Sequence, residues 1–99
     1  MAAKRLFTAE KQGEKIAVEV KSFIGHSNQA EFHTALGQYL EYELALEEEY
    51  PDFTLYLAVP VDVYKTFFSL QFIQQVLQRY HIRLLVYNVN QEVIRAVRQ

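Results

Sequence analysis

The sequence predicts a single α/β domain, residues 1–99, built on a mixed β-sheet flanked by helices. The chain has 99 residues, which is the length of one domain. Hydrophobic residues make up 51% of it and charged residues 22%, a balance typical of folded proteins rather than disordered ones. Strand-like stretches alternate with stretches of helical spacing in the order β-β-α-β-α-β-β, the pattern of α/β folds.

The chain opens with a predicted β-hairpin. Strands are expected over 5–11 and 16–22, and Gln12-Gly13 supplies the tight turn because glycine accepts positive φ. A hairpin closed there pairs residues whose numbers sum to about 25, so Glu19 would face Leu6. The second strand alternates, and we expect its apolar side chains to face the core, namely Ile16, Val18 and Val20. The opposite face would carry Ala17, Glu19 and Lys21.

A long helix is predicted next, ending near Glu48. Asn28 and Glu31 have the spacing of a capping box, with Ser27 as the rival cap. Side chains at helical spacing indicate one buried face, formed by Phe32, Ala35, Leu36, Tyr39, Leu40 and, at its margin, Glu43. Tyr50-Pro51-Asp52 should end the helix because the residue before a proline disfavours the helical conformation.

The second half of the chain is predicted to add three strands and a helical segment. Residues 54–59 are almost continuously apolar and precede Pro60, as expected for a strand covered on both faces. A helical segment bent near Ser69 follows, with an apolar stripe formed by Phe72, Ile73, Val76, Leu77 and Tyr80. Residues 83–88 predict another buried strand, and a turn at 89–91 leads into a last strand over 92–98. Right-handed crossovers would place each helix over a sheet face.

Charge and composition limit the classes of function. The net charge of −2 argues against a generic nucleic-acid binder held by counterion release. Six of the twelve acidic residues lie within 41–52, so the remaining chain has ten Lys or Arg against six acids and leaves room for a basic face. The lack of cysteine excludes disulfides and thiolate metal sites. No apolar run approaches the roughly 20 residues of a membrane span, and the first residues do not form a secretory signal, so we expect a soluble, cytoplasmic protein.

Glu19 and Lys21 form the first candidate for chemistry. Two residues apart in a strand, they would lie on one face of the sheet. In metal-dependent phosphodiester cleavage a carboxylate holds Mg²⁺, and a lysine orients the attacking water or stabilises developing charge. The alternative is a pair without chemistry, since many solvent-exposed strands carry Glu-x-Lys. An exposed Glu19 carboxylate would contribute little to stability.

Gln38 and Tyr42 form the second candidate. They are one helical turn apart, so a helix packed on the sheet could aim both at the strand of Glu19. The alternative is that Tyr42 lies at the core edge and Gln38 is a half-buried polar residue. The histidines lack zinc-binding spacing, and we interpret them as ordinary surface or half-buried residues: His26, His33 and His81.

These blocks together resemble a known family. Glu19-x-Lys21 on a strand, followed by Gln38 and Tyr42 on a helix, resembles the RecB-like branch of the PD-(D/E)xK nuclease superfamily. The segments 9–23, 35–39 and 55–60 resemble the XisH family, the fdxN-element excision controlling factors of cyanobacteria. The resemblance implies a restriction-endonuclease-like fold, a site that contains all four residues, and Glu19 as a ligand of Mg²⁺ or Mn²⁺.

The resemblance also implies a role and partners. The family is associated with programmed excision of a DNA element during heterocyst development. The resemblance implies three partners, namely DNA, the companion controlling factor XisI and, indirectly, a site-specific recombinase that performs strand exchange. It implies no contact with a membrane. Family members begin with a helix and a strand ahead of the position of Met1, and that strand carries the motif Asp. Against the family, this chain is therefore expected to be N-terminally truncated, to have a misassigned start or to carry a degenerate nuclease site, and in each case the site lacks its second carboxylate.

Glu10 lies near the hairpin turn and is a poor substitute for the motif Asp. Without the leading helix, apolar sheet surface would be uncovered and would favour a homo-oligomer. Three functions stay open at this point. They are an accessory factor for DNA excision on a nuclease-like scaffold, a Mg²⁺-dependent DNA endonuclease, and a non-catalytic protein-interaction module.

Overall fold

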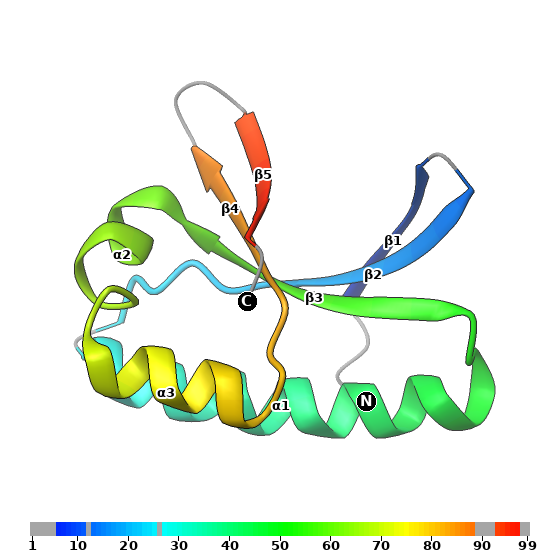
Figure 1. Cartoon of the computed structure of the whole chain (residues 1–99), viewed down its shortest axis with the longest axis horizontal. Coiled ribbons are helices and arrows are strands. Elements are labelled where there is room, and N and C mark those ends of the chain that lie inside the picture. The colour runs from blue at the N-terminus through cyan, green and yellow to red at the C-terminus, as the bar shows by residue number, and fades with distance from the viewer. Residues whose placement is uncertain (1–5, 12, 26, 89–92, 98–99) are drawn as a thin grey trace.

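The computed structural model describes residues 6–11, 13–25, 27–88 and 93–97, which form a five-stranded sheet with packed helices (Figure 1). The elements are β1 (Leu6–Lys11), β2 (Glu14–Val20), α1 (Asn28–Glu49), β3 (Phe53–Pro60), α2 (Val61–Thr66), α3 (Gln71–Arg79), β4 (Leu84–Asn88) and β5 (Val93–Val97). The predicted order of strands and helices is confirmed in part, because the single helical segment expected to be interrupted or bent near Ser69 is two helices, α2 and α3. In the described part of the chain, no helix combines the length and the apolar character needed to cross a bilayer.

The five strands lie in the sheet in the order in which they occur along the chain. β1 and β2 are antiparallel, as are β4 and β5, whereas β2, β3 and β4 run parallel to one another. Leu6 pairs with Glu19, so the predicted hairpin register is confirmed. Gly13 has a φ of 83° in the hairpin turn, a conformation that glycine adopts without steric cost. The turn predicted at 89–91 lies outside the described residues.

α1 and α3 lie on the same side of the sheet (Figure 1). From β2 to β3 to β4 the chain advances across the sheet in one direction, and right-handed crossovers then place both connecting helices on one face. The core forms between that face and the helices. Its strand residues are Ala17, Leu55, Leu57, Val59, Leu84 and Val86.

The predicted orientation of β2 is wrong. Ile16, Val18 and Val20 are only half-buried, whereas Ala17 and Glu19 are fully buried. Side chains of β2 alternate between the two faces as predicted, but this alternation does not determine which face the helices cover. Because both crossovers fall on the side of Ala17 and Glu19, the apolar face of β2 lies on the opposite side of the sheet.

α1 begins and ends close to the predicted positions. Its N-cap is Ser27, whose side-chain oxygen accepts a hydrogen bond from the Ala30 N–H at 3.2 Å, so of the two predicted candidates Ser27 is confirmed and Asn28 is wrong. Ser27 has the extended backbone that an N-cap requires, while Asn28 is already helical. The C-cap is Tyr50, and Pro51 follows it, as expected.

The buried faces of the helices are narrower than the patterns predicted. On α1 the buried residues are Phe32, Ala35, Tyr39 and Tyr42, and Leu40 is 40% exposed. On α3 only Ile73 and Leu77 are buried, and Phe72 is 67% exposed. A helix packed on one sheet face buries one or two positions per turn, so the flanking apolar residues of α1 and α3 remain in solvent.

An aromatic cluster closes the end of the core where β2 leads into α1. It consists of Phe23, Phe32, Phe67 and Phe68. Ring centroids of neighbouring members lie 5.5 to 6.4 Å apart, mostly in edge-to-face arrangements. Phe23 has a φ of 58°, a left-handed conformation that is uncommon outside glycine. The cluster anchors the connection between the two elements that carry the candidate site.

Candidate functional site

Glu19 lies in the interior of the sheet and beneath the helical layer. In β2 it pairs with Leu6 of β1 on one side and with Leu57 of β3 on the other. Its side chain is fully buried, so the expectation of an exposed carboxylate with little influence on stability is wrong. The cause is the placement of α1, which packs over the face of the sheet that carries Ala17 and Glu19.

Lys21 and Gln38 meet between β2 and α1. The Nζ atom of Lys21 donates to Oε1 of Gln38 at 3.4 Å, and both side chains are half-buried. The Lys21 N–H also donates to the Ala58 carbonyl at 2.9 Å, which extends the parallel pairing of β2 and β3 by one residue. Because side chains alternate along a strand, Lys21 lies on the same face as Glu19. Gln38 is therefore directed at the strand of Glu19, and its half-buried position also fits the alternative of a polar residue without chemistry.

Tyr42 is a core residue on the sheet side of α1. It is 8% exposed and belongs to the same buried cluster as Ala17 and Leu55. The structure thus brings all four candidate residues to the layer between β2 and α1. A buried carboxylate, a half-buried ammonium group and an amide are gathered there, and Tyr42 supports them from the core.

The carboxylates near Glu19 limit the kind of Mg²⁺ or Mn²⁺ site that this layer could form. Among residues 6–11, 13–25, 27–88 and 93–97, no group of three His, Asp or Glu side chains lies close enough to hold a metal ion. Mg²⁺ requires near-octahedral oxygen coordination and is usually bound by one or two carboxylates together with water and substrate oxygens. Glu10 pairs with Lys15 next to the hairpin turn and is exposed, far along β2 from Glu19.

The histidines lie apart from this layer in the described structure. His33 contacts Gln29 on the exposed side of α1, at 2.9 Å between the two Nε2 atoms. His81 adopts a φ of 55° after α3, where Ile82 N–H donates to the Leu77 carbonyl and completes the helix end. His26 lies outside the described residues. Both described histidines are therefore in ordinary structural positions.

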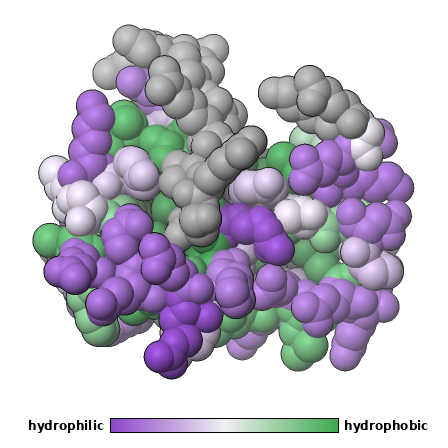
Figure 2. Space-filling model, viewed as in Figure 1, coloured by the Kyte–Doolittle hydropathy of each residue, from purple (hydrophilic) through white to green (hydrophobic). Residues whose placement is uncertain are grey.

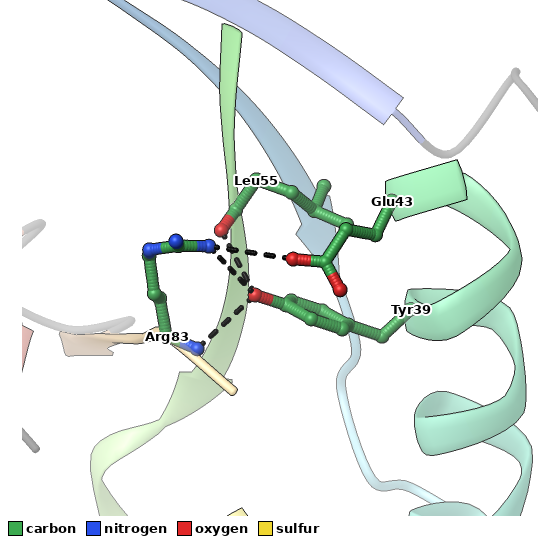
Figure 3. Close-up of polar contacts among 4 residues, drawn as sticks. All are labelled: Tyr39, Glu43, Leu55 and Arg83. Carbon is green, nitrogen blue, oxygen red and sulfur yellow. Dashed lines mark hydrogen bonds and ion pairs between the residues drawn. The ribbon is translucent and has the colours of Figure 1, made fainter. Parts of the chain in front are cut away.

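A polar cluster that the sequence did not indicate lies beside the candidate site (Figure 3). The Tyr39 hydroxyl donates to the Leu55 carbonyl at 3.1 Å and accepts a hydrogen bond from the Arg83 N–H at 3.2 Å. The Arg83 guanidinium lies 3.5 Å from the same hydroxyl and 3.6 Å from Oε2 of Glu43. Tyr39 therefore joins α1 to β3 and to the start of β4, within one turn of Gln38 and Tyr42.

No local signal would have revealed this cluster. Arg83 is 44 residues from Tyr39 in sequence, and its N–H becomes a partner only when β4 is placed beside β3. Tyr39 was assigned to the buried face from its helical spacing, but spacing does not distinguish a buried tyrosine from a buried phenylalanine. A tyrosine in a position that buries its whole ring is the one available hint, because a buried hydroxyl needs a hydrogen-bond partner.

Burial raises the pKa of the Tyr39 hydroxyl, with the nearby Glu43 carboxylate acting in the same direction. A raised pKa in the folded state means that stability is complete below the ordinary tyrosine pKa of about 10 and is lost as pH rises above it. We expect the urea midpoint of the wild-type protein to fall more steeply between about pH 9.5 and 11 than that of Tyr39→Phe. Burial also raises the pKa of Tyr87, so the variant keeps part of the alkaline loss. Equal slopes for the two proteins would contradict this expectation.

The chain is similar to a known family model and to two solved structures. Residues 1–95 match the family model described as XisH protein. A solved structure of an XisH family protein from Nostoc punctiforme is 49% identical, with a TM-score of 0.90 over 94% of this chain and 74% of that one. A fdxN element excision controlling factor protein from Anabaena variabilis is 52% identical, with a TM-score of 0.89 over the same shares, 94% and 74%. No curated protein gives a significant match.

Proposed function

This chain belongs to the XisH family, and we propose that it controls the excision of a DNA element as an accessory factor. The observation that carries the proposal is the likeness to the Anabaena variabilis protein, whose description names it as a fdxN element excision controlling factor. At 52% identity across 94% of this chain, the two proteins share much of their sequence as well as their backbone fold. Membership of the family confirms the relationship that the three sequence segments predicted.

We further propose that the fold is a nuclease-like scaffold of the PD-(D/E)xK type. Support comes from the arrangement of Glu19 and Lys21 on an interior strand, opposite Gln38 and Tyr42 on the helix that follows it. We favour a residual site over an active endonuclease, because no group of three His, Asp or Glu side chains among the described residues lies close enough to hold a metal ion. In this proposal Mg²⁺ and Mn²⁺ are not needed for the excision-control role.

The proposed partners follow from the same reasoning. The cutting and rejoining of DNA are assigned to a separate recombinase, and the chain acts on it through the companion factor XisI and the DNA complex. The net charge of −2 favours recruitment by protein contacts over unaided binding to the DNA backbone. Cytoplasmic location is part of this proposal, since the element would be excised from cellular DNA.

A complementation experiment tests the proposal and separates it from the endonuclease alternative. A host that carries the DNA element and lacks its own copy of the gene receives the wild-type chain, Glu19→Gln or Lys21→Met. Excision is measured by quantitative PCR across the rejoined ends. We expect the wild type to restore excision and both variants to remain within about twofold of it, because neither side chain performs chemistry in an accessory factor.

Two results would decide against the proposal. No excision with the wild-type chain would remove the assigned role. A loss of about a hundredfold or more in Glu19→Gln, in a protein that still unfolds cooperatively, would favour catalysis at Glu19. Calorimetric titration with Mn²⁺ provides an independent readout. Heat that is present for the wild type and absent for Glu19→Gln would also support the endonuclease.

A further inference from the structure

The outer face of α1, on the side turned away from the sheet, carries small and apolar residues in solvent. Leu44 is 59% exposed and Leu40 is 40% exposed. Ala30, Gly37 and Leu44 are seven residues apart, all exposed, and therefore line up along the helix. Figure 2 shows hydrophobic surface between hydrophilic residues along its lower edge, where the helices lie in Figure 1. We define the outer face of α1 as Ala30, His33, Thr34, Gly37, Leu40, Glu41 and Leu44.

Within the part of the chain that the structure describes, no contact requires a glycine at position 37. A Cβ added there would meet nothing within 4 Å, and its backbone is not left-handed. A glycine in a helix interior costs about 1 kcal/mol relative to alanine. Glycine does allow a second backbone to approach closely, which is a role that only a binding partner would use.

We propose that the outer face of α1 binds the same face of a second copy of this chain, in an antiparallel pair with its two-fold axis at Gly37. α1 spans Asn28–Glu49, so Gly37 lies near its middle and the two helices overlap along most of their length. In that register Leu44 of each copy meets Ala30 of the other, and Leu40 meets Thr34. Each leucine then faces a smaller side chain, His33 faces Glu41 of the other copy, and the two glycine backbones meet at the axis.

The charges on α1 favour this direction of pairing. Its last turn contains Glu47, Glu48 and Glu49 and no basic residue, so three carboxylates lie at the negative end of the helix dipole. The antiparallel register places Glu47 and Glu48 beside the other copy's α1 N-terminus. That end has a partial positive charge and carries a single acid, Glu31, in its first turn. A parallel pair would instead bring the two acidic ends together.

Sedimentation velocity on the whole chain tests the dimer. We expect the wild type to dimerise, and Leu44→Glu to weaken dimerisation at least about 100-fold, because symmetry buries two carboxylates opposite apolar atoms. Leu70→Glu is the matched control, since Leu70 is similarly exposed at 53% but lies outside α1. It should dimerise like the wild type. Gly37→Ala should raise the urea midpoint of the monomer and weaken the dimer, an opposition that a purely structural role would not produce.

Thiol cross-linking tests the orientation, since the chain has no cysteine of its own. Thr34→Cys keeps the side-chain size, places two thiols about 9 Å apart along the helix pair and should cross-link through a bismaleimide of that reach. Glu48→Cys places them about 33 Å apart along the helix pair and should not. The proposal is overturned by a monomeric wild type at about 100 μM, by a dimer that survives Leu44→Glu, or by cross-linking at Glu48 as efficient as at Thr34.

Discussion

A Phe68→Ala protein is expected to lose about 3–5 kcal/mol of its free energy of unfolding, a large share of the 5–15 kcal/mol typical of a domain. Phe68 is fully buried, and its ring packs at 5.5 to 5.7 Å from the rings of Phe23, Phe32 and Phe67. Removing it leaves a cavity that these neighbours cannot fill, since Phe23 and Phe32 are fixed by the loop and by α1. Urea unfolding followed by circular dichroism measures the loss.

The control for this substitution is Phe72→Ala. Phe72 is also a phenylalanine but is 67% exposed, so we expect its substitution to change the free energy of unfolding by no more than about 0.5 kcal/mol. If Phe68→Ala does not fold, Phe68→Leu keeps most of the volume and should cost less than the alanine variant. Similar losses for Phe68→Ala and Phe72→Ala would contradict the structure at this end of the core.

The Tyr39→Phe protein is expected to lose about 1–3 kcal/mol, although a single oxygen atom is removed. The hydroxyl accepts from the Arg83 N–H and donates to the Leu55 carbonyl (Figure 3), so its loss leaves a backbone donor without its acceptor. The lost stability arises mainly from the unpaired Arg83 N–H, because the Leu55 carbonyl belongs to a strand within the sheet. Urea unfolding at pH 7 measures the difference.

Tyr50→Phe is the matched control for the tyrosine. Tyr50 is 57% exposed and its ring packs against Phe53, so its hydroxyl is not needed for the core. We expect its unfolding midpoint to match the wild type. A Tyr39→Phe protein as stable as Tyr50→Phe would show that the hydroxyl bonds of Tyr39 are replaced by water without cost.

The strands and their register could be predicted because their signals are local. Glycine at position 13 and the alternation of β2 define the hairpin, and Leu6 opposite Glu19 follows from counting. The helix was bounded by Ser27 and Pro51, which act on neighbouring residues. The sequence leaves the cap open between Ser27 and Asn28, because serine and asparagine have nearly equal preference for the N-cap and only the backbone conformation separates them.

The burial of Glu19 could not be predicted in the same way. Alternation shows that Ile16 and Glu19 lie on opposite faces of β2, but the apolar face is normally assigned to the core. That rule fails here because the covered face is fixed by the direction of two crossovers, which involve β3 and β4. A carboxylate under a helix is an exception to the usual pattern, and such exceptions occur most often at functional sites.

Within the candidate site, the local pair was predictable and the distant one was not. Gln38 and Tyr42 share a helix face by spacing, and the face turned out to be the one directed at β2. The hydrogen bond between Tyr39 and Arg83 joins residues that are 44 positions apart, and it depends on the position of β4 in the sheet. Side-chain hydrogen bonds of that kind carry no periodic signature in a sequence.

The sequential order of strands in the sheet has a consequence for how the protein folds during synthesis. Each strand from β2 onward pairs with the strand made just before it, so a growing sheet always presents the correct edge to the next segment. No strand must wait for one that is still inside the ribosome, and none must insert between two that have already paired. Translation from the N-terminus therefore follows the same path as assembly of the sheet, which shortens the time that an unpaired edge is available for aggregation.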